Sequence, residues 1–472
     1  MNQSDINKRA LRAGLWYTIC NFLARGINFL TTPFFTRLMS KGEYGSYSNF
    51  ASWLSLLTIL TTLDLYTSIS RAKYDYKDNI NEYVASVQLL GTLATIISYI
   101  FVCMFPSFFT KLFDMDMFYI HIMFFYMMVS PAFTLLQSKH RQYMKYKTVT
   151  ILSLTSTILS VLISLILVLN MDDKFLARVI GGTGVLIGFY LIIYLYNLYK
   201  SKYLMISCWK YGLSISLPLI IHVLSNNILG TSDRIIINNY CGSEKTALYS
   251  VVYSCSQIAT MLFNSINQAW SPWFYEKLNQ KEYSEINHAT KYYIVISSVV
   301  VIILMLLGPE IIFIFGGTNY MESIYIVPCI LLGCFYWVLY TFFINTEIFY
   351  KKTLSISVRT MVGALINIIG NIIFIPIFGW QAAAYTTLIG YYLLFILHSL
   401  AGKKLGTDKY FNQAFFYKVS AIMFFIMIII RITYNHIIFR IMLIIVAIFT
   451  IILFCFKKRN KINNLISKKI SK

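Results

Sequence analysis

The sequence predicts an all-α membrane protein of about 14 transmembrane helices, arranged as two six-helix lobes in parallel repeat plus two C-terminal helices. Three observations predict this fold class. Of the 472 residues, 58% are hydrophobic and only 12% are charged, whereas soluble domains carry about 25% charged residues. Apolar runs repeatedly reach the roughly 20 residues that a helix needs to cross a bilayer. The loops between these runs also alternate in their content of lysine and arginine.

The predicted spans are apolar runs separated by charged residues or by glycine and proline. In the first half of the chain they lie near 14–36, 46–69, 84–109, 117–138, 149–170, 176–199 and 211–236. In the second half they lie near 246–270, 291–315, 324–348, 354–378, 381–400, 414–434 and 437–456. The longest predicted loop, 271–290, mixes aromatic and charged residues and is typical of a segment that lies along the membrane interface.

The distribution of cations predicts the orientation of these spans. One set of alternate loops and the two tails carry 30 of the 40 lysines and arginines, the other loops carry nine, and Arg25 alone lies within a span. Cytoplasmic loops are the ones rich in lysine and arginine, so both termini are predicted to be cytoplasmic. The net charge of +21 is explained in the same way, and no nucleic-acid partner is expected because the cations form no single patch.

The short loops and the scattered cysteines limit the chemistry that the protein can perform. No loop has room for a soluble catalytic domain, which disfavours an enzyme such as a membrane glycan polymerase. The eight cysteines include no CxxC pair and have no histidine at zinc spacing, so no metal site is expected. The chain has no GxxxxGK[ST] motif for ATP. Transport would therefore depend on an H⁺ or Na⁺ gradient, with no other cofactor.

The two halves of the chain show a weak internal repeat, offset by about 200 residues. A Gly-Leu pair opens the first span at Gly14 and the seventh at Gly212, and SKGEYGSYS (Ser40–Ser48) precedes the second span as GSEKTALYS (Gly242–Ser250) precedes the eighth. Because each half holds an even number of spans, the repeat is parallel rather than inverted. The expected units are an N-terminal lobe at 1–205, a C-terminal lobe at 206–403, and two extra helices with a basic tail at 404–472.

Polar side chains follow one face of the first predicted span. Asn21, Arg25 and Asn28 are separated by three or four residues, which places them on the same side of a helix. Arg25 falls near the bilayer midplane, where an arginine costs about 2.5 to 3.5 kcal/mol on insertion scales. It should therefore face protein or a wet cavity. A cavity for an anionic substrate is one interpretation, and a structural ion pair is the other.

Three further spans carry polar residues at helical spacing, and Pro218 should bend the seventh span. Any one polar face is explained equally well by packing, because a hydrogen bond between membrane helices contributes only about 0.6 kcal/mol. Four such faces indicate a substrate pathway. The candidate cavity residues are Asn21, Arg25, Asn28, His222, Asn226, Tyr253, Gln257, Asn264, Arg359 and Asn367, and Asn371 continues the last of these faces.

Four charged residues are candidates for ion coupling or gating. They are Asp64, Asp233, Arg234 and Glu347. A carboxylate at membrane depth can carry a proton or Na⁺. Asp64 and Glu347 have simpler alternatives: Asp64 neutralises Arg25, and Glu347 is an ordinary interface charge. The Asp233–Arg234 pair is either a pair of gate charges or a local topology stop.

Two segments resemble those of a known family. GLWYTICNFLARGINFLTTPFFTRLMSKGEYGSYS (Gly14–Ser48) and SDRIIINNYCGSEKTALYS (Ser232–Ser250) resemble the polysaccharide-export flippases, the Wzx-type proteins of the multidrug/oligosaccharidyl-lipid/polysaccharide superfamily. The matching features are a Gly-initiated first span, an Arg-Leu pair at Arg37 and an E-Y-G-x-Y turn from Glu43 to Tyr47.

The resemblance implies a bacterial cytoplasmic-membrane flippase that works by alternating access. It would move an undecaprenyl-pyrophosphate-linked oligosaccharide, such as a lipopolysaccharide O-antigen or capsule repeat unit, to the outer leaflet through a cationic cavity. Its partners would be that lipid-linked glycan, membrane lipids and other polysaccharide-assembly proteins. A lipid II-type flippase and a cation-coupled multidrug exporter of the same superfamily are the alternatives.

Overall fold

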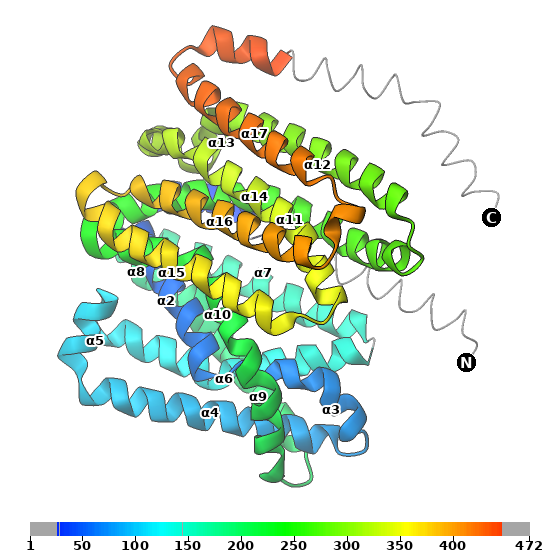
Figure 1. The fold of residues 1–472 in the computed structure, drawn as a ribbon. Helices are drawn as coiled ribbons and strands as arrows, with labels where there is room; N and C mark the ends of the chain where they lie inside the picture. The colour runs from blue at the N-terminus through cyan, green and yellow to red at the C-terminus, as the bar shows by residue number, and fades with distance from the viewer. Residues whose placement is uncertain (1–25, 28, 144, 446–472) are drawn as a thin grey trace.

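The computed structural model describes residues 26–27, 29–143 and 145–445, and these residues form helices and turns without a β-strand (Figure 1). The prediction of an all-α fold is confirmed. The first part of the described chain contains a helical stretch at 29–38, then α2 (Lys41–Thr61), η1 (Leu65–Ser68), α3 (Ile69–Asp75), α4 (Ile80–Met104), α5 (Pro106–Phe113), α6 (Met117–Gln142), α7 (Tyr146–Asn170), α8 (Lys174–Val179), η2 (Ile180–Gly184) and α9 (Val185–Lys200).

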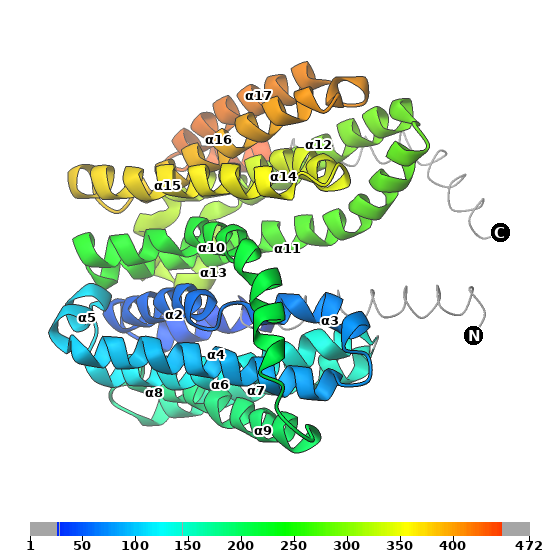
Figure 2. The ribbon, with the colours of Figure 1, turned by 60° about the horizontal axis from the view of Figure 1, so that its bottom comes forward.

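The second part begins with two long helices. Its elements are α10 (Ser207–Cys241), α11 (Ser243–Asn279), α12 (Tyr283–Leu306), α13 (Gly308–Gly316), η3 (Thr318–Ile326), α14 (Val327–Phe349), α15 (Thr353–Phe378), α16 (Ala382–Lys404), η4 (Thr407–Lys409), α17 (Gln413–Thr433) and a helical stretch at 437–445. Figure 2 shows α2 to α9 in one bundle and α12 and α14 to α17 in another layer, with α10, α11 and α13 between them. We count these three helices with the second bundle.

The described residues contain nine helices long and apolar enough to cross a membrane, and eleven if two bent pairs are each counted as one span. One pair joins α2 to residues Leu65–Asp75 at 50°, and the other is α10, bent by 45° between Ser207–Ile221 and Val223–Cys241. Pro218 predicts a bend in this span, and the bend lies one turn after that residue, whereas a proline disrupts the turn before it. The chain is a multi-pass membrane protein. The count of 14 stays a prediction, because the first and last predicted spans extend beyond the described residues.

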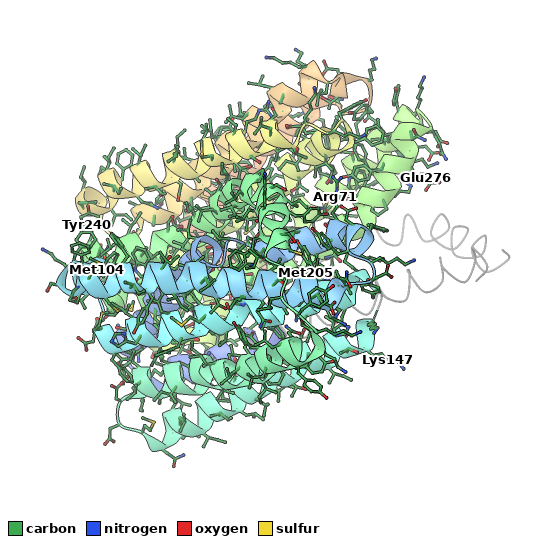
Figure 3. The ribbon with its side chains drawn as sticks, turned by 90° about the horizontal axis from the view of Figure 1, so that it is seen from below. Arg71, Met104, Lys147, Met205, Tyr240 and Glu276 are labelled. Carbon is green, nitrogen blue, oxygen red and sulfur yellow. The ribbon has the colours of Figure 1, made fainter. Side chains whose placement is uncertain are left out.

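The two ends of the bundles hold the residues that the alternation of loops assigns to opposite sides. Figure 3 shows Met104 and Tyr240 at one end of the molecule, and Arg71, Lys147 and Glu276 toward the other. The end that holds Arg71 and Lys147 is the one that the sequence predicts to be cytoplasmic, and we call it the basic end. The opposite end is called the outer end.

Local sequence explains where α2 begins and ends. Ser40 and Glu43 form a capping box: the Ser40 hydroxyl accepts from the Glu43 N–H at 3.2 Å, and the Glu43 carboxylate accepts from the Ser40 N–H at 2.7 Å. The same carboxylate accepts from the Lys174 N–H at 3.2 Å, which ties α8 to the start of α2. At the other end, Leu63 and Asp64 adopt positive φ angles of 57° and 47°. This left-handed backbone interrupts the helix in mid-span.

The prediction that 271–290 is a loop is wrong. Residues 271–279 continue α11 as a helix, and α12 begins only four residues after α11 ends. Phe274 is fully buried and its ring packs against Tyr410 and Phe411, with centroids 6.0 and 5.7 Å away. Lys277 closes the α11–α12 turn by pairing with Glu282 and Glu285, which raises the pKa of its ammonium group.

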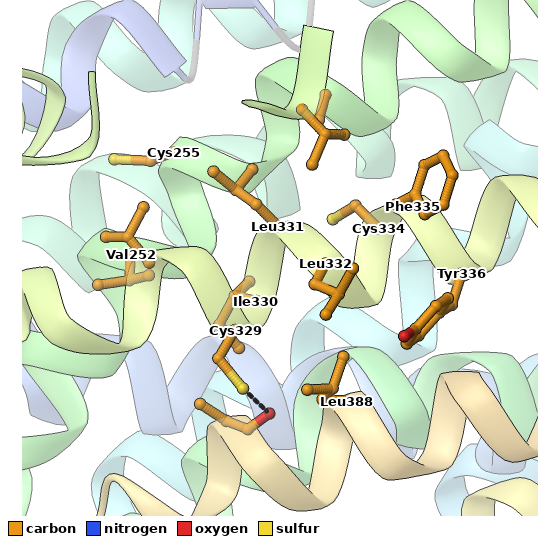
Figure 4. Close-up of a cluster of buried hydrophobic side chains, with 14 of the residues drawn as sticks. Val252, Cys255, Cys329, Ile330, Leu331, Leu332, Cys334, Phe335, Tyr336 and Leu388 are labelled. Carbon is orange, nitrogen blue, oxygen red and sulfur yellow. Dashed lines mark hydrogen bonds between the residues drawn. The ribbon is translucent and has the colours of Figure 1, made fainter. Parts of the chain in front are cut away.

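Helix α14 forms the centre of the second bundle. Of the apolar stretch that includes α14, 89% is buried, against 28% for α15 and α17, which face outward. Figure 4 shows its side chains Leu331, Leu332 and Phe335 among those of neighbouring helices. The Cys329 thiol donates to the Ala384 carbonyl at 3.2 Å, which connects α14 to α16.

Candidate functional site

The two bundles contact each other through α2, α10 and α11, and their contacts extend to the outer end. Here the Thr36 hydroxyl donates to the Phe315 carbonyl, and Asn238 of α10 donates to Asp114 at 2.7 Å. Gly45 of α2 packs on Ser243 of α11 so closely that a Cβ atom at position 45 would lie 1.7 Å from the Ser243 carbonyl oxygen. The outer end of the interface is therefore closed in this structure.

A polar contact also joins the bundles nearer mid-membrane. The Asn227 amide of α10 donates to the Ser55 hydroxyl of α2 at 2.9 Å. The sequence prediction selected the neighbouring Asn226, which is exposed in the structure. Helical spacing placed Asn226 on the face of Asp233, whereas the side chain that meets α2 is that of the next residue.

The side chain of Asp233 is the centre of a buried hydrogen-bond network. It is 1% exposed and accepts three hydrogen bonds from three different helices. Tyr249 of α11 and Thr387 of α16 donate to Oδ2 at 2.5 and 2.6 Å, and Asn371 of α15 donates to Oδ1 at 2.6 Å. Asp233 thus connects α10 to α11, α15 and α16 at a single point.

A second layer of amides and hydroxyls surrounds these donors. Asn367 donates to Thr387 Oγ1 at 3.1 Å, and Asn367 Oδ1 accepts from Ser232 at 3.4 Å. The Thr386 hydroxyl donates to Asn371 Oδ1. Of this network, the sequence prediction contained Asp233, Asn367 and Asn371. It missed Tyr249, Thr386 and Thr387, which are common residue types that only the fold brings to the carboxylate.

The network has the composition of a site for a small cation or a proton. No ion pair to Asp233 is present in the part of the chain that the structure describes. Burying an uncompensated carboxylate is costly, and three neutral donors offset that cost only in part. Carboxylate, amide and hydroxyl oxygens are the ligands that hard cations prefer. Binding of a cation or a proton at Asp233 would therefore stabilise this arrangement.

Arg234 lies beside this network and has an unsatisfied donor. Its guanidinium carbon is 4.2 Å from the ring centre of Tyr253 on α11, a cation–π contact. The Nε atom is buried and has no hydrogen-bond partner in the structure. Arg178 of α8 lies over the rings of Phe35 and Tyr47, 3.4 and 4.8 Å from their centres. Each bundle therefore contributes an arginine held against aromatic rings, and Tyr253, a predicted cavity residue, lies against Arg234.

Glu347 and Arg359 form an ion pair, although the sequence prediction gave them separate roles. Arg359 Nη1 donates to Glu347 Oε2 at 2.6 Å, and His398 Nδ1 lies 2.7 Å from Glu347 Oε1. The Glu347 side chain is 1% exposed and that of His398 is fully buried, so the interface-charge alternative for Glu347 does not fit. The triad connects α14, α15 and α16 near the basic end.

A groove near the same end is lined by Arg359 and two lysines. Lys351 and Lys352 of the α14–α15 turn line it together with Arg359 and Val358, and its volume is about 490 Å³. Only Arg359 among these cations pairs with a carboxylate in the described residues. The groove is therefore positively charged and opens at the end that the sequence predicts to be cytoplasmic.

The remaining predicted residues fall into three groups. Asp64 is 5% exposed, and its Oδ2 atom is buried without a hydrogen-bond partner in the structure. Gln257 and Asn264 of α11 are half buried, and Gln257 accepts from Thr260 at 3.2 Å. Asn21, Arg25, Asn28 and the side chain of His222 lie outside what the structure describes, so their roles stay predictions.

Comparison with known proteins identifies the family. The profile of the polysaccharide biosynthesis protein family matches residues 10–278, more than half of the chain. The chain belongs to this family. The profile of the MatE family also matches residues 218–379, which include Asp233 and Asn371. Both matches place the chain in the multidrug/oligosaccharidyl-lipid/polysaccharide superfamily, as the sequence motifs indicated. A search of curated proteins found no match.

The fold is shared with solved transporters of this superfamily. The structure of the lipid II flippase MurJ in an inward closed conformation superposes with a TM-score of 0.68 at 18% identity, covering 95% of this chain and 99% of MurJ. An inward-facing MATE transporter gives 0.57 at 14% identity, over 85% and 98% of the two chains. An outward-facing MATE structure gives 0.53 at 13% identity, over 85% and 96%. At these identities the likeness establishes the fold alone.

Proposed function

We propose that the protein is an ion-coupled flippase for undecaprenyl-pyrophosphate-linked oligosaccharide repeat units. It would act in the bacterial cytoplasmic membrane with both termini in the cytoplasm, alongside other polysaccharide-assembly proteins. The observation that carries the proposal is the membership of the polysaccharide biosynthesis protein family. It is joined to a two-bundle fold in which Arg234 has a buried Nε atom without a partner among the described residues.

The arrangement of the bundles supports transport by alternating access. The contacts at Thr36, Gly45 and Asn238 close the outer end. A substrate would enter from the basic end and leave when these contacts separate. These contacts are a few hydrogen bonds and one close helix approach. The coupling free energy typical of allosteric transitions, about 1 to 3 kcal/mol, is therefore of the size needed to separate them.

The cations at the interface support an anionic substrate. The pyrophosphate of a lipid-linked glycan carries negative charge, and arginine offers a forked set of donors that suits phosphate oxygens. Arg234 has a buried Nε without a hydrogen-bond partner among the described residues. Arg178 of the other bundle lies over the rings of Phe35 and Tyr47. Arg25 remains the candidate from the first span. Membrane-buried cations of this kind favour a lipid-linked phosphate over the cationic drugs that a multidrug exporter would carry.

The Asp233 network supports coupling to H⁺ or Na⁺. The carboxylate holds together four helices of the second bundle, including α10, which also contacts α2. Occupation of Asp233 by a cation would favour the packing seen here, and its release would allow α10 to shift. An ion gradient can bias the exchange between states only through such differential binding.

Reconstituted vesicles test the proposed substrate. Purified protein is placed in liposomes that contain one fluorescent probe: an undecaprenyl-pyrophosphate oligosaccharide, lipid II, or a cationic dye. Gradient-dependent translocation of the oligosaccharide lipid, and little of the other two, is expected. Preferential movement of lipid II, or uptake of the dye alone, would contradict the proposed substrate and assign the protein to the corresponding alternative.

A further inference from the structure

Two apolar grooves on the second bundle meet at a single arginine near the outer end. The first groove, about 480 Å³, lies between η3, α16 and α17 and is lined by Leu388, Met427 and Ile428. The second, about 370 Å³, lies between α15 and α16 and is lined by Phe378 and Ile389. Both volumes fall within the roughly 300 to 1,000 Å³ of ligand sites.

Arg431 and Tyr385 line both grooves. Arg431 is in the last turn of α17, and its guanidinium carbon lies 5.8 Å from the ring centre of Tyr385. The first groove is closed at its polar edge by Tyr325, whose hydroxyl donates to Asn435 at 2.8 Å. Most polar groups of the two grooves are thus gathered at the outer end. Apolar side chains line the remainder except at Thr386 of the Asp233 network, which lines the second groove.

Arg431 has no carboxylate partner among the described residues, a property that it shares with outer-end cations such as Lys111 but not with two others of the second bundle. Arg440 pairs with Glu310, and Lys245 pairs with Glu322 at 2.6 Å. Arg431 is exposed at the mouth of the grooves. An exposed arginine at the end of a membrane helix lies at the depth of the lipid headgroups, where phosphate is the abundant anion. Its positive charge therefore complements a lipid phosphate.

We infer that this double groove binds one anionic diacyl phospholipid of the outer leaflet. The phosphate lies on Arg431, and one acyl chain occupies each groove. Two grooves that diverge from one cation fit two chains on one headgroup, whereas a polyprenyl phosphate has a single chain and would fill only one of them. The site is separate from the Arg234 region and independent of the proposed substrate.

The bound lipid would link the appended helix α17 to the six-helix part of its bundle. Helix α17 packs on α12 and α14 through its buried face, which includes Phe416, Met423 and Met427. The adjoining edge of the helix, which shares Met427 with this face, lines the first groove beside α16. The simpler explanation for Arg431 is that it only stabilises the carbonyl end of α17 through the helix dipole. That explanation requires no lipid.

Lipid retention measured by native mass spectrometry tests the site. The protein is purified in detergent with added dioleoyl-phosphatidylglycerol, dioleoyl-phosphatidylcholine or undecaprenyl phosphate, and the fraction with one bound lipid is measured. Wild-type protein is expected to retain phosphatidylglycerol preferentially. Arg431→Gln should weaken this retention about tenfold or more, because a charge-assisted hydrogen bond contributes about 1.5 to 3 kcal/mol, and Arg431→Lys should keep part of it.

Two groove variants separate the lipid site from a purely structural role. Ile428→Trp fills the first groove and Ile389→Trp the second, and both positions are exposed, at 39% and 54%, so neither variant should disturb the fold. Each should reduce retention of phosphatidylglycerol. Lys111→Gln, which removes an outer-end cation from the last turn of α5, should leave it unchanged. Equal retention by wild type and Arg431→Gln would overturn the inference. Loss in only one groove variant, or preference for undecaprenyl phosphate, would overturn the diacyl assignment.

Discussion

Gly45 of α2 and Ser243 of α11 approach so closely that there is no space for a methyl group between them. A Cβ atom at position 45 would lie 1.7 Å from the Ser243 carbonyl oxygen and 2.5 Å from its carbon. Both atoms belong to backbone, so neither can move aside without a shift of the helix. The outer closure of the interface therefore depends on a glycine at this position.

Replacing Gly45 with alanine should open the outer end. The added methyl group forces α2 and α11 apart, at a cost of about 1 to 3 kcal/mol for an overpacked contact. The expected result is greater labelling of a cysteine introduced at Thr36 by a membrane-impermeant maleimide from the outside. Gly42→Ala is the matched control, because its Cβ would lie 3.6 Å from the Ser243 hydroxyl, an ordinary contact. Equal labelling of both variants would show that Gly45 does not close the interface.

Replacing Glu347 with glutamine should destabilise the second bundle. The change leaves Arg359 and His398 without their carboxylate partner, and breaking a buried ion pair costs about 3 to 5 kcal/mol. A clear fall in the thermal unfolding midpoint in lipid nanodiscs is expected. Glu322→Gln is the comparison: it breaks the exposed pair with Lys245, and exposed pairs contribute about 0 to 1 kcal/mol. Similar small shifts of the unfolding midpoint in both variants would show that the Glu347 triad does not stabilise the second bundle.

Replacing Arg234 with glutamine should weaken substrate binding without unfolding the protein. The variant keeps a polar side chain but loses the charge that approaches the bundle interface. We expect translocation to fall at least tenfold in vesicles, and Arg234→Lys to retain part of it if charge alone matters. Lys245→Gln removes a nearby cation that already pairs with Glu322 and should have little effect. Unchanged translocation by Arg234→Gln would exclude Arg234 from the substrate path.

The fold class follows from the sequence because it depends on local properties. Apolar runs define the helices. The distribution of lysine and arginine predicts which loops lie at the same end of the bundles, and Arg71 and Met104 lie at opposite ends as this predicts. The same local reasoning failed for 271–279. The mix of aromatic and charged residues suggested an interfacial loop, but Phe274 and Leu278 lie one turn apart and are buried on a continuing helix.

The candidate site was predictable where an unusual residue marked it. An aspartate and two asparagines within membrane spans carry a free-energy cost that marks them as functional candidates. In the structure, Asp233, Asn367 and Asn371 belong to one hydrogen-bond network. Tyr249, Thr386 and Thr387 carry no such signal, because hydroxyl residues are common in membrane helices and only the crossing of α10, α11 and α16 brings them to the carboxylate. His398 was missed for the same reason: its partner Glu347 is 51 residues away in sequence.

The Asp233→Asn variant tests ion coupling, the central claim, most directly. Asparagine keeps the size of the side chain and removes the charge, so the fold should persist while the proton or Na⁺ site is lost. Translocation of an undecaprenyl-pyrophosphate oligosaccharide is measured in vesicles with an imposed H⁺ gradient, an imposed Na⁺ gradient, or neither, and Asp172→Asn at an exposed loop position is the control. Wild type and the control should respond to one of the gradients, and Asp233→Asn should respond to neither. A full gradient response in Asp233→Asn would contradict the account.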